Sequence, residues 1–582
     1  MLLNGEPPRS AFAPIWRRLR SGALWVAVAL ALPIGVLAAL LTSAFRLGIE
    51  ALDSALLGSQ ADITVHFAAL PWYWRLLLPT LGALLAGALL SWERRLRREP
   101  GERDYMEAIA EGDGRVPLRS SLLRATSSLA TIVSGGSIGR EGAMVQLAAL
   151  SGSLSGRRWA DSSTLRLCTA CGAAAGLASV YHTPLAGAMF VAEVVLGSIT
   201  VERLIPLFAA AVTATLTVHA LGSEAAPFAL AQGGAQLGGG GLALLLVVGL
   251  AAGLLGPPFL ALLDRARRVF LRVPAPLVLR MALGALLMGA ITLLVPEVAG
   301  NGYEPIRAIL HEAPLSVPVG WLLLAKIAAT LLIAGSGAIG GIFTPALFIG
   351  AALGSLIAGA AAALPVPGLS ADTVLLALVG MGAFMTAVSH APLMSILMVF
   401  EMTMDASLLL PLMCGCVLAY TVSGLFRRRN SLYAVLDRRQ LKASEIRAYE
   451  ATPLAQLVRP PSKTLAPDAT LAEAHELFGL ARRRYLHVID AQGRFVGALS
   501  VHRLHEVLYR SPSSASAPVK DYLESDFLIL PAHLTLAQAW DALTHLPVDW
   551  LPVVDDLQHR HVLGVISKRE ILARVTELRR ER

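Results

Sequence analysis

Between residues 22 and 425, long apolar runs follow one another with few charges between them, and this feature constrains the fold more than any other. Three of the runs are ALWVAVALALPIGVLAALL, LALLLVVGLAAGLLGPPFLALL and GWLLLAKIAATLLIAG. A helix needs roughly 20 apolar residues to cross a bilayer core of about 30 Å, and several runs reach that length. After residue 437 the composition is that of an ordinary soluble protein. We therefore predict an α-helical multi-pass membrane protein with a soluble C-terminal region.

Charge is scarce, and it gathers at the ends of the apolar runs. Charged residues make up 15% of the chain, against about 25% in soluble proteins, and the formal net charge is +8. Basic clusters precede the first run (WRRLR), follow the second (WERRLRREPGER) and follow the last (FRRRN), whereas the loop 47–74 has no Lys or Arg. By the positive-inside rule, both termini of a plasma-membrane protein (the inner membrane in a bacterium) are predicted to be cytoplasmic. No basic-aromatic patch favours nucleic-acid binding.

Gly- and Pro-rich breaks interrupt the apolar sequence at two corresponding places. GGSIGREG lies upstream of TPLAGAMFVAE, GSGAIGGIFTP lies upstream of APLMSILMVFE, and each second motif carries a Glu nine positions after its Pro. Irregular backbone is tolerated at membrane depth only inside protein or along a polar pathway. Broken helices at matched positions of two halves indicate a transporter-like fold with a substrate site near the midplane.

The soluble region contains a repeat of its own. DATLAEAHELFGLARRRYLHVIDAQGRFVGALSVHRL and HLTLAQAWDALTHLPVDWLPVVDDLQHRHVLGVISKREI each read as a helix, a strand, an Asp-containing turn, a strand with Gly and a Ser that opens a helix. We therefore predict two α/β modules in tandem.

The sequence offers little for enzyme chemistry. It has no His-Cys cluster, nucleophile elbow or phosphate loop, so we predict no catalytic residue, no metal site and no required cofactor. Cys168 and Cys171 have CxxC spacing in an apolar stretch, and we interpret them as small buried thiols. Lys326 is expected to snorkel or to pair with a carboxylate, with a place near the pathway as the alternative. Glu401 and Asp405 are expected to cap helices.

Four motifs carry a resemblance to one known family. GREGAMVQ (139–146), GGIFTPALFIGAALG (340–354), APLMSILMVFEMT (391–403) and SLYAVL (431–436) resemble the CLC family of chloride channels and proton-coupled chloride transporters. RDYMEAIAEG and GREGAMVQLAAL are most similar to a bacterial branch described as voltage-gated chloride channels. The soluble tail resembles a pair of CBS domains.

With this resemblance the chain divides into five parts: a cytoplasmic segment 1–21, an anion-conducting membrane domain 22–436, a linker 437–452, a first CBS domain 453–512 and a second CBS domain 513–582. The resemblance implies a homodimer in the lipid bilayer. Each subunit would have its own anion pathway, built from two repeats of inverted topology. The predicted function is transport of chloride or a similar small anion by a glutamate-gated channel. A proton-coupled anion antiporter is the alternative, and a CBS-based sensor with vestigial transport comes third.

The Gly-rich turns suit the binding of an anion. Backbone amides at helix N-termini hold an anion without a full countercharge, and glycine lets the backbone approach the ion closely. GSIGREG and GAIGGIFTP meet both requirements. The predicted anion-binding residues of the two turns are Gly139, Arg140, Gly142, Gly341, Ile342 and Phe343.

The resemblance assigns roles to Glu141 and Tyr433. The Glu of the family's GREG motif is the gate, whose carboxylate occupies an anion position until protonation or an anion displaces it, and here that residue is Glu141. The alternative is a Glu that pairs with Arg140 and caps a helix. Arg140 itself is expected to be structural, with carbonyl groups or another carboxylate as its partners. Tyr433 matches the family's pore tyrosine, with a tyrosine at the membrane interface as the alternative.

Two places depart from the family pattern. Where the family has a Ser-containing turn, this chain has GERDYMEA, so Arg103, Asp104 or Tyr105 would stand at the inner anion site. For Arg103 a solvated loop charge is the alternative. The position of the family's proton-relay Glu is Val194. Because valine carries no proton, this residue favours passive conduction.

The CBS pair raises the question of a ligand. Such pairs often bind adenine nucleotides in the cleft between the modules, and the matching positions of the second module are Ser567 and Glu570. An adenine nucleotide is one expectation for this site. A purely structural or dimerising role is the other.

Overall fold

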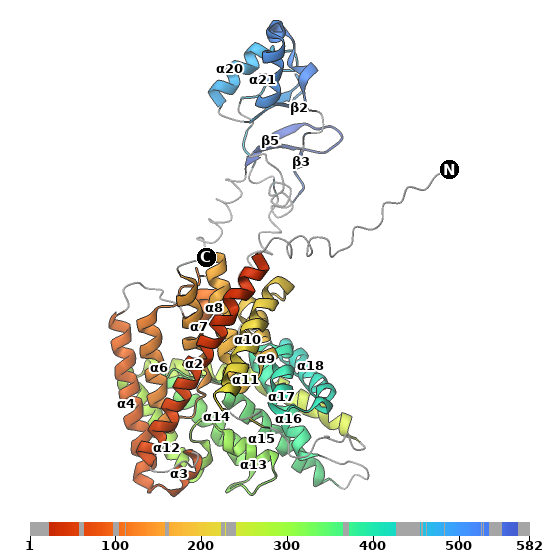
Figure 1. Ribbon diagram of the computed structural model, residues 1–582. Helices are drawn as coiled ribbons and strands as arrows, with labels where there is room; N and C mark the ends of the chain where they lie inside the picture. The colour runs from red at the N-terminus through yellow and green to blue at the C-terminus, as the bar shows by residue number, and fades with distance from the viewer. Residues whose placement is uncertain are drawn as a thin grey trace. The chain divides into compact units, whose positions relative to one another are not determined.

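The computed structural model describes residues 23–57, 63–96, 104–110, 112–157, 162–222, 227–228, 240–364, 372–426, 454, 458–460, 463–481, 484–524, 527, 529–534 and 550–567. The chain forms two compact units, Met1–Asp437 and Arg438–Arg582. Figure 1 shows the first as a bundle of helices and the second as a smaller α/β unit.

The described residues of the first unit form helices joined by turns and irregular segments. Its long and short α-helices are α2 (Ala23–Leu57), α3 (Ile63–Ala69), α4 (Trp72–Leu96), α5 (Tyr105–Ala110), α6 (Leu118–Val133), α7 (Glu141–Gly156), α8 (Ser162–Tyr181), α9 (Pro184–Phe190), α10 (Val201–Ala220), α11 (Gly241–Arg272), α12 (Leu277–Leu294), α13 (Tyr303–Leu310), α14 (Val319–Ser336), α15 (Phe343–Ala362), α16 (Thr373–Ser389), α17 (Pro392–Thr403) and α18 (Leu409–Leu425). A π-turn, η1 (Val191–Leu196), and two 3₁₀ turns, η2 (Pro296–Val298) and η3 (Ala406–Leu408), complete it.

Eight helices in the described part of the chain are long and apolar enough to cross a membrane. Outer helices such as α2 expose large apolar side chains, among them Trp25 and Leu40, as lipid-facing helices do. The inner helix α16, in contrast, is buried continuously from residue 375 to residue 389. The multi-pass helical membrane fold predicted from the apolar runs is confirmed.

The two Pro-Leu helices cap each other. The carboxylate of Glu401, in α17, accepts hydrogen bonds from the amides of Leu185 (2.9 Å) and Ala186 (2.8 Å) at the start of α9. In return, the carboxylate of Glu193, in η1, accepts from the amides of Leu393 (3.4 Å) and Met394 (2.9 Å) at the start of α17. Each carboxylate thereby satisfies two orphan donors of the opposite half. The matched halves predicted from the repeated Glu are confirmed.

The backbone before each Pro-Leu helix is also the same in both halves. His182 has φ 58° and His390 has φ 55°, and each is followed by a residue with nearly the same dihedral angles (φ −120°, ψ 77° at Thr183; φ −125°, ψ 78° at Ala391) and then by the proline. A left-handed residue is uncommon outside glycine, so its recurrence at corresponding positions marks a shared turn. Asp405 accepts a hydrogen bond from the amide of Ser407 (2.9 Å), which confirms the predicted cap there.

Glycine allows close packing of neighbouring helices in each half. A Cβ on Gly152 of α7 would strike the carbonyl of Cys168 in α8, and a Cβ on Gly354 of α15 would strike the carbonyl of Leu376 in α16. Small residues let backbones approach where lipid offers no hydrophobic driving force between helices. Cys168 and its neighbour Cys171 are buried free thiols, as predicted.

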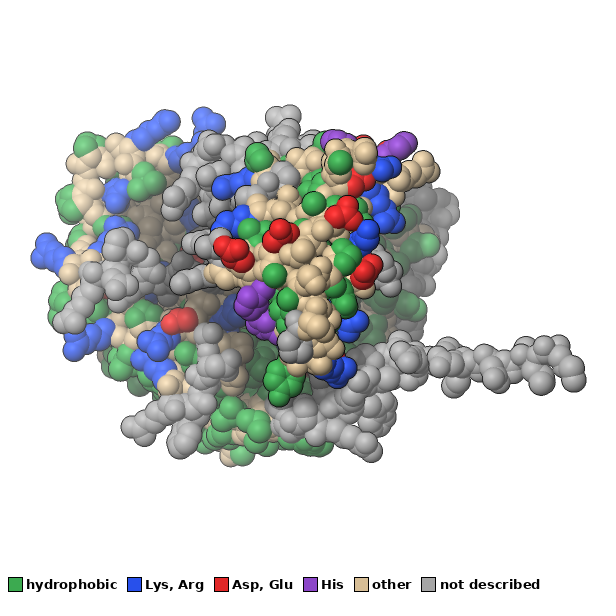
Figure 2. All heavy atoms as spheres, turned by 90° about the horizontal axis from the view of Figure 1, so that it is seen from above, with side chains coloured by type: hydrophobic (Ala, Val, Ile, Leu, Met, Phe, Trp, Pro, Cys, Tyr) green, Lys and Arg blue, Asp and Glu red, His purple; other side chains and the backbone are tan. Residues whose placement is uncertain are grey.

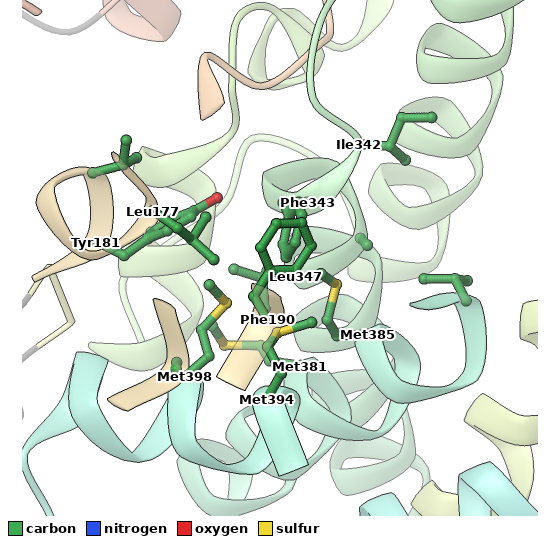
Figure 3. Close-up of a cluster of buried hydrophobic side chains, with 14 of the residues drawn as sticks. Leu177, Tyr181, Phe190, Ile342, Phe343, Leu347, Met381, Met385, Met394 and Met398 are labelled. Carbon is green, nitrogen blue, oxygen red and sulfur yellow. The ribbon is translucent and has the colours of Figure 1, made fainter. Parts of the chain in front are cut away.

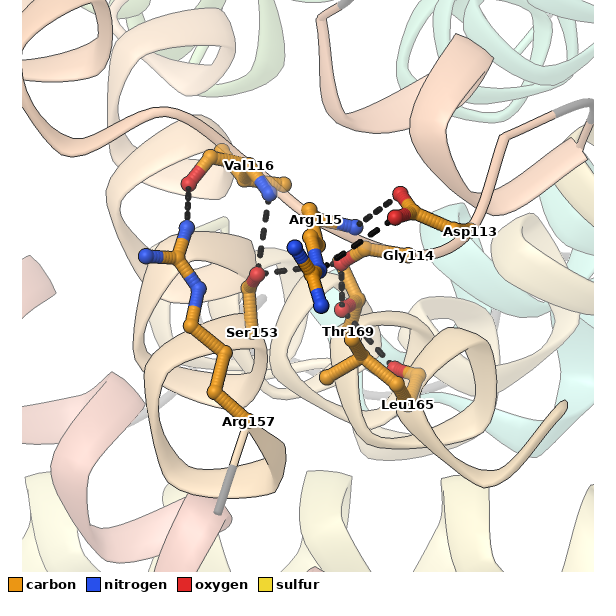
Figure 4. A network of polar contacts seen from close by, with 8 residues as sticks. All are labelled: Asp113, Gly114, Arg115, Val116, Ser153, Arg157, Leu165 and Thr169. Carbon is orange, nitrogen blue, oxygen red and sulfur yellow. Dashed lines mark hydrogen bonds and ion pairs between the residues drawn. The ribbon is translucent and has the colours of Figure 1, made fainter. Parts of the chain in front are cut away.

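A polar network holds the turn between α5 and α6 against α7 and α8 (Figure 4). Ser153 accepts from the amide of Val116 (2.9 Å) and donates to the carbonyl of Gly114 (3.0 Å). Thr169 donates to the same Gly114 carbonyl (2.7 Å), and Arg157 donates to the carbonyl of Val116 (2.6 Å). Because these buried backbone groups are satisfied by side chains, the short helix α5 has a defined place next to α7.

The second unit repeats one strand pair. Its elements are α20 (Leu471–Ala481), β1 (Tyr485–Ile489), β2 (Phe495–Ser500), α21 (Val501–Arg510), η5 (Pro512–Ser516), η6 (Val519–Tyr522), β3 (Leu530–Pro531), β4 (Trp550–Val554) and β5 (Val562–Ser567). β1 pairs antiparallel with β2, β4 pairs antiparallel with β5, and β3 runs parallel to β4. Both antiparallel pairs place a Ser opposite the first residue and shift register before the last pair. The tandem α/β reading of this region is confirmed.

The surface of the second unit carries both acidic and basic side chains (Figure 2). They form exposed pairs such as Arg494 with Asp490 (2.8 Å) and Lys520 with Asp468 (2.8 Å). The hydrogen bond between His559 and Asp556 (2.7 Å) lowers the pKa of that carboxyl group to about 2. Exposed pairs of this kind contribute little to stability, because water screens them.

Removing the Glu401 carboxylate should destabilise the membrane unit. Glu401→Ala leaves the buried amides of Leu185 and Ala186 without their acceptors, a loss of about 1–3 kcal/mol. We expect a lower thermal unfolding midpoint in detergent, measured on the full chain. Glu401→Gln keeps one acceptor oxygen, so its thermal midpoint should lie between those of the wild-type protein and of Glu401→Ala. An unchanged midpoint for the alanine variant would contradict the capping role.

Candidate functional site

Two Gly-rich turns meet at a pair of backbone hydrogen bonds. The amide of Gly139 donates to the carbonyl of Gly341 (2.8 Å), and the amide of Gly341 donates to the carbonyl of Gly139 (2.8 Å). Two residues further along each turn a helix begins, α7 at Glu141 and α15 at Phe343. The bridge therefore brings two helix N-termini together inside the membrane unit, where their partial positive charges favour an anion.

The carboxylate of Glu141 occupies this meeting point. It is 1% exposed. Its Oε1 accepts hydrogen bonds from the hydroxyl of Tyr181 (2.6 Å) and from the hydroxyl of Thr344. Among the described residues, Oε2 has no hydrogen-bond partner. A buried carboxylate is costly unless its charge is compensated, so the helix N-termini and the two hydroxyls are the groups that hold it.

Glycine is required around this carboxylate. A Cβ on Gly139 or on Gly341 would overlap the carboxylate of Glu141, and a Cβ on Gly142 would approach the Gly341 amide nitrogen to 3.2 Å. The prediction that glycine permits close approach is thus supported in geometry. The amides of Gly139 and Gly341, two of the predicted anion-binding residues, donate to each other's carbonyl groups, and anion binding at these two residues stays a prediction. Ile342 and Phe343 stand at the N-terminus of α15, and Arg140 and Gly142 flank Glu141.

Two cations near the site, the half-buried Arg140 and the fully buried Lys326, have partners that differ from those expected. Arg140 places its guanidinium 5.2 Å from the ring centroid of Tyr303, a cation–π contact in place of the expected carbonyl or carboxylate. Lys326 is 0% exposed and donates to the carbonyls of Val298 (3.2 Å) and Gly300 (3.1 Å). The expectation that Lys326 snorkels or pairs with a carboxylate is therefore wrong. Its contacts are two carbonyls and the ring of Phe348, 5.0 Å away.

A cavity of about 200 Å³ adjoins Glu141. It brings Glu141 together with Ile342 and Phe343 and with Asp104 and Tyr105, two of the three residues expected at an inner anion site. Its wall is completed by Met106, Arg124, Ala125, Gly142, Ala143, Val145, Gln146, Leu177, Phe190, Arg267, Ile339, Gly340 and Gly341. The space is large enough for a small ion with part of its hydration shell.

Two arginines and a glutamine also line this cavity. Arg124 and Arg267 add positive charge to a wall that carries the carboxylates of Asp104 and Glu141. Gln146 accepts a hydrogen bond from the amide of Tyr105 (3.2 Å) and donates to Ser121 (2.9 Å), which fixes the start of α5 on α7. Sequence analysis passed over these residues, because their meeting depends on how α5, α6, α7 and α11 pack.

One side of the site is apolar. Phe190 and Phe343 meet edge to face with centroids 5.4 Å apart, and Figure 3 shows them between Leu177 and a group of methionines from α16 and α17. Val194 lies in the adjoining π-turn and is 0% exposed. The position expected to have lost the proton relay is thus buried among apolar groups, in keeping with its inability to carry a proton.

Some expected site residues lie outside the described part of the chain. These are Arg103, Tyr433 and Glu570, and Ser567 is described only as the last residue of β5. Conversely, Tyr181 and Thr344 contact the predicted gate and were not singled out. Tyr181 carries a weak signal, since it precedes the HTPL turn. Among the described residues, no group of three or more His, Cys, Asp or Glu could hold a metal ion.

Known proteins with similar sequences are chloride channel proteins, and the C-terminal region is similar to CBS domains. A family model described as "Voltage gated chloride channel" matches residues 81–424, and a CBS domain model matches residues 454–510 and 519–577. A "Putative chloride channel protein ClcB-like" from Ralstonia nicotianae is 47% identical over 395 residues, 67% of this chain and 92% of the relative. A "Voltage-gated ClC-type chloride channel ClcB" from Salmonella typhimurium is 39% identical over 404 residues, 69% of this chain and 96% of the relative.

Solved structures show the same fold. A CLC-type fluoride/proton antiporter superposes with a TM-score of 0.60 at 27% identity, covering 71% of this chain and 98% of that protein. A eukaryotic CLC transporter superposes with a TM-score of 0.59 at 18% identity over 94% of this chain and 98% of its own, and it supports the fold alone.

A methyl group at position 341 should disturb the site. Gly341→Ala would place its Cβ on Oε2 of Glu141, and overpacking of this kind costs about 1–3 kcal/mol. We expect a lower thermal midpoint of the full chain in detergent. The control is Gly359→Ala in α15, the helix that follows this turn, where no atom lies within 4 Å of the new Cβ. Equal midpoints for the two variants would show that the cradle does not need glycine.

Proposed function

The chain belongs to the CLC family of chloride channels and transporters and is an anion-transporting membrane protein of that family, and on this premise we propose that it conducts chloride or a similar small anion past a gate formed by Glu141. The observation that carries the proposal is the buried carboxylate of Glu141 at the meeting point of two helix N-termini. A negative group held there occupies a place that suits an anion.

Glu141 can act as a gate because its carboxylate and a transported anion compete for the same binding position. The carboxylate of Glu141 and a transported anion both need the positive ends of α7 and α15, and the glycine cradle has room for one of them. Movement or protonation of Glu141 frees that place. Because the helix ends supply partial rather than full charges, an anion bound there can also leave, as conduction requires.

The cavity gives the anion a route from Glu141 toward Asp104 and Tyr105. Arg124 and Arg267 raise the local anion concentration along it, because charged side chains on low-dielectric walls focus the field. The amide and ring of Tyr105, held by Gln146, stand where the inner anion site is proposed, without the small hydroxyl donor that the family has there.

Two transport modes agree with this site. Passive conduction is favoured by Val194, a buried apolar residue at the relay position. Proton-coupled antiport is favoured by the 27% identical structural relative, which is a fluoride/proton antiporter. We put the channel first, because a proton relay needs a titratable group at this depth, and the relay position has none. A CBS-based sensor with vestigial transport is less supported, since the gate and its cradle are complete.

The proposal extends to the assembly and its membrane. We propose a homodimer, as in the resemblance, in a bacterial-type inner membrane with both termini in the cytoplasm. The basic side chains Arg94 and Arg95 at the end of α4 support that orientation. An adenine nucleotide at the CBS pair, near Ser567 and Glu570, is a further proposal that nucleotide titration of the full chain would test.

The transport mode is decided by a reversal potential. We expect liposomes holding the full chain under a chloride gradient to show the chloride equilibrium potential, unchanged when a pH gradient is added. In passive conduction no proton moves with the anion, so a proton gradient does not change the reversal potential. A reversal potential that moves with the pH gradient would refute the channel and establish antiport.

The gate is tested by removing its charge. Glu141→Ala and Glu141→Gln should raise anion flux at neutral pH several-fold and abolish its dependence on pH, because the competing carboxylate is gone. Glu50→Gln is the control, since this carboxylate lies exposed on α2 and pairs with Arg46. Flux and pH dependence that survive in the Glu141 variants would show that Glu141 is not the gate.

A further inference from the structure

The hydroxyl groups around Glu141 come from two separate helices and converge on one point. Tyr181 is the last residue of α8, and Thr344 lies in the first turn of α15. Both side chains are fully buried, and both donate to the same oxygen, Oε1 of Glu141. Figure 3 shows Tyr181 with its hydroxyl turned toward the side of the cluster where Phe343 lies.

The two hydroxyls have only two protons between them, and both protons point at the same oxygen, which is the pattern of an anion site. The two hydroxyl oxygens lie 3.0 Å apart, but each hydroxyl has one proton, and Oε1 accepts both. Neither proton is then left for a bond between the two hydroxyls. Two buried protons that point at one acceptor, next to the N-terminus of α15, need a negative atom there.

We propose that the hydroxyls of Tyr181 and Thr344 are ligands of the transported anion, which takes the place of Oε1 when Glu141 leaves. This inference rests on the proposed role of Glu141 as the gate and adds two residues that determine specificity. In the closed state the two hydroxyls hold the carboxylate. In the open state they donate to the ion, so the same two bonds serve both occupants.

The geometry also names a class of anion. The two protons converge on a single acceptor atom, Oε1, while Gly139 and Gly341 close around the other oxygen of the same carboxylate, Oε2. A monoatomic halide presents one acceptor in all directions and fits this convergence. A planar oxyanion such as nitrate spreads its charge over three oxygens, so two hydrogen bonds to one of those oxygens stabilise it less. The hydroxyl pair therefore favours a halide over nitrate.

The test measures anion binding without the competing carboxylate. In purified full-length Glu141→Ala protein, chloride and nitrate are titrated by calorimetry, alone and combined with Tyr181→Phe or Thr344→Val. Each second substitution should weaken chloride binding roughly tenfold, because a hydrogen bond to an ion is lost, and should weaken nitrate binding less. Thr330→Val is the matched control, a buried threonine of α14 whose hydroxyl has no hydrogen-bond partner among the described residues.

The outcomes separate this inference from the gate. If Glu141→Ala raises flux but neither second substitution changes chloride affinity, the hydroxyls are not anion ligands and the gate stands. If Glu141→Ala leaves flux and its pH dependence unaltered, the gate fails and the hydroxyl site fails with it. Should Tyr181→Phe not fold, Thr344→Val tests the same point from a different helix, with a thermal midpoint equal to that of Thr330→Val as evidence of folding.

Discussion

Two hydrogen bonds between the backbones of Gly139 and Gly341 set the geometry on which the rest of the membrane unit depends. At membrane depth no water is available to hydrogen-bond the amide and carbonyl groups of irregular backbone, so each turn needs other protein groups as partners. The bridge satisfies four backbone groups at once and brings the first residues of α7 and α15 together. Because both partners are glycine, space remains beside the bridge for a charged group. The carboxylate of Glu141 lies in that space.

The two halves of the unit also hold each other through their carboxylates. Glu193 caps the helix that carries Glu401, and Glu401 caps the helix that begins at Pro184. A cap taken from the opposite half ties the broken helices into one body, whereas a cap from the same helix would leave the halves independent. The broken ends can therefore stay in place around a pathway even though their own hydrogen-bond ladders stop there.

Sequence analysis placed the breaks, the repeated Glu and the tandem soluble modules correctly, because each depends on local residue type and spacing. It erred where a side chain's partner is remote. Lys326 contacts carbonyls of the turn 298–300, and Arg140 lies over the ring of Tyr303. Neither partner is marked by charge or by spacing in the sequence. Tyr181 and Thr344 were overlooked for the same reason, since a hydroxyl in an apolar helix gives no sign of its acceptor.

Three features of this protein follow from its residues alone: a multi-pass helical membrane fold, helices that break at matched glycines and prolines, and an ionisable Glu141 at one of the breaks. They do so because apolar length, glycine and charge are local properties. The bridge between the two breaks at Gly139 and Gly341, and the meeting of hydroxyls from α8 and α15 on one carboxylate oxygen, become known only from how the helices pack. Those contacts join residues 40 to about 200 positions apart, and packing of whole helices determines them.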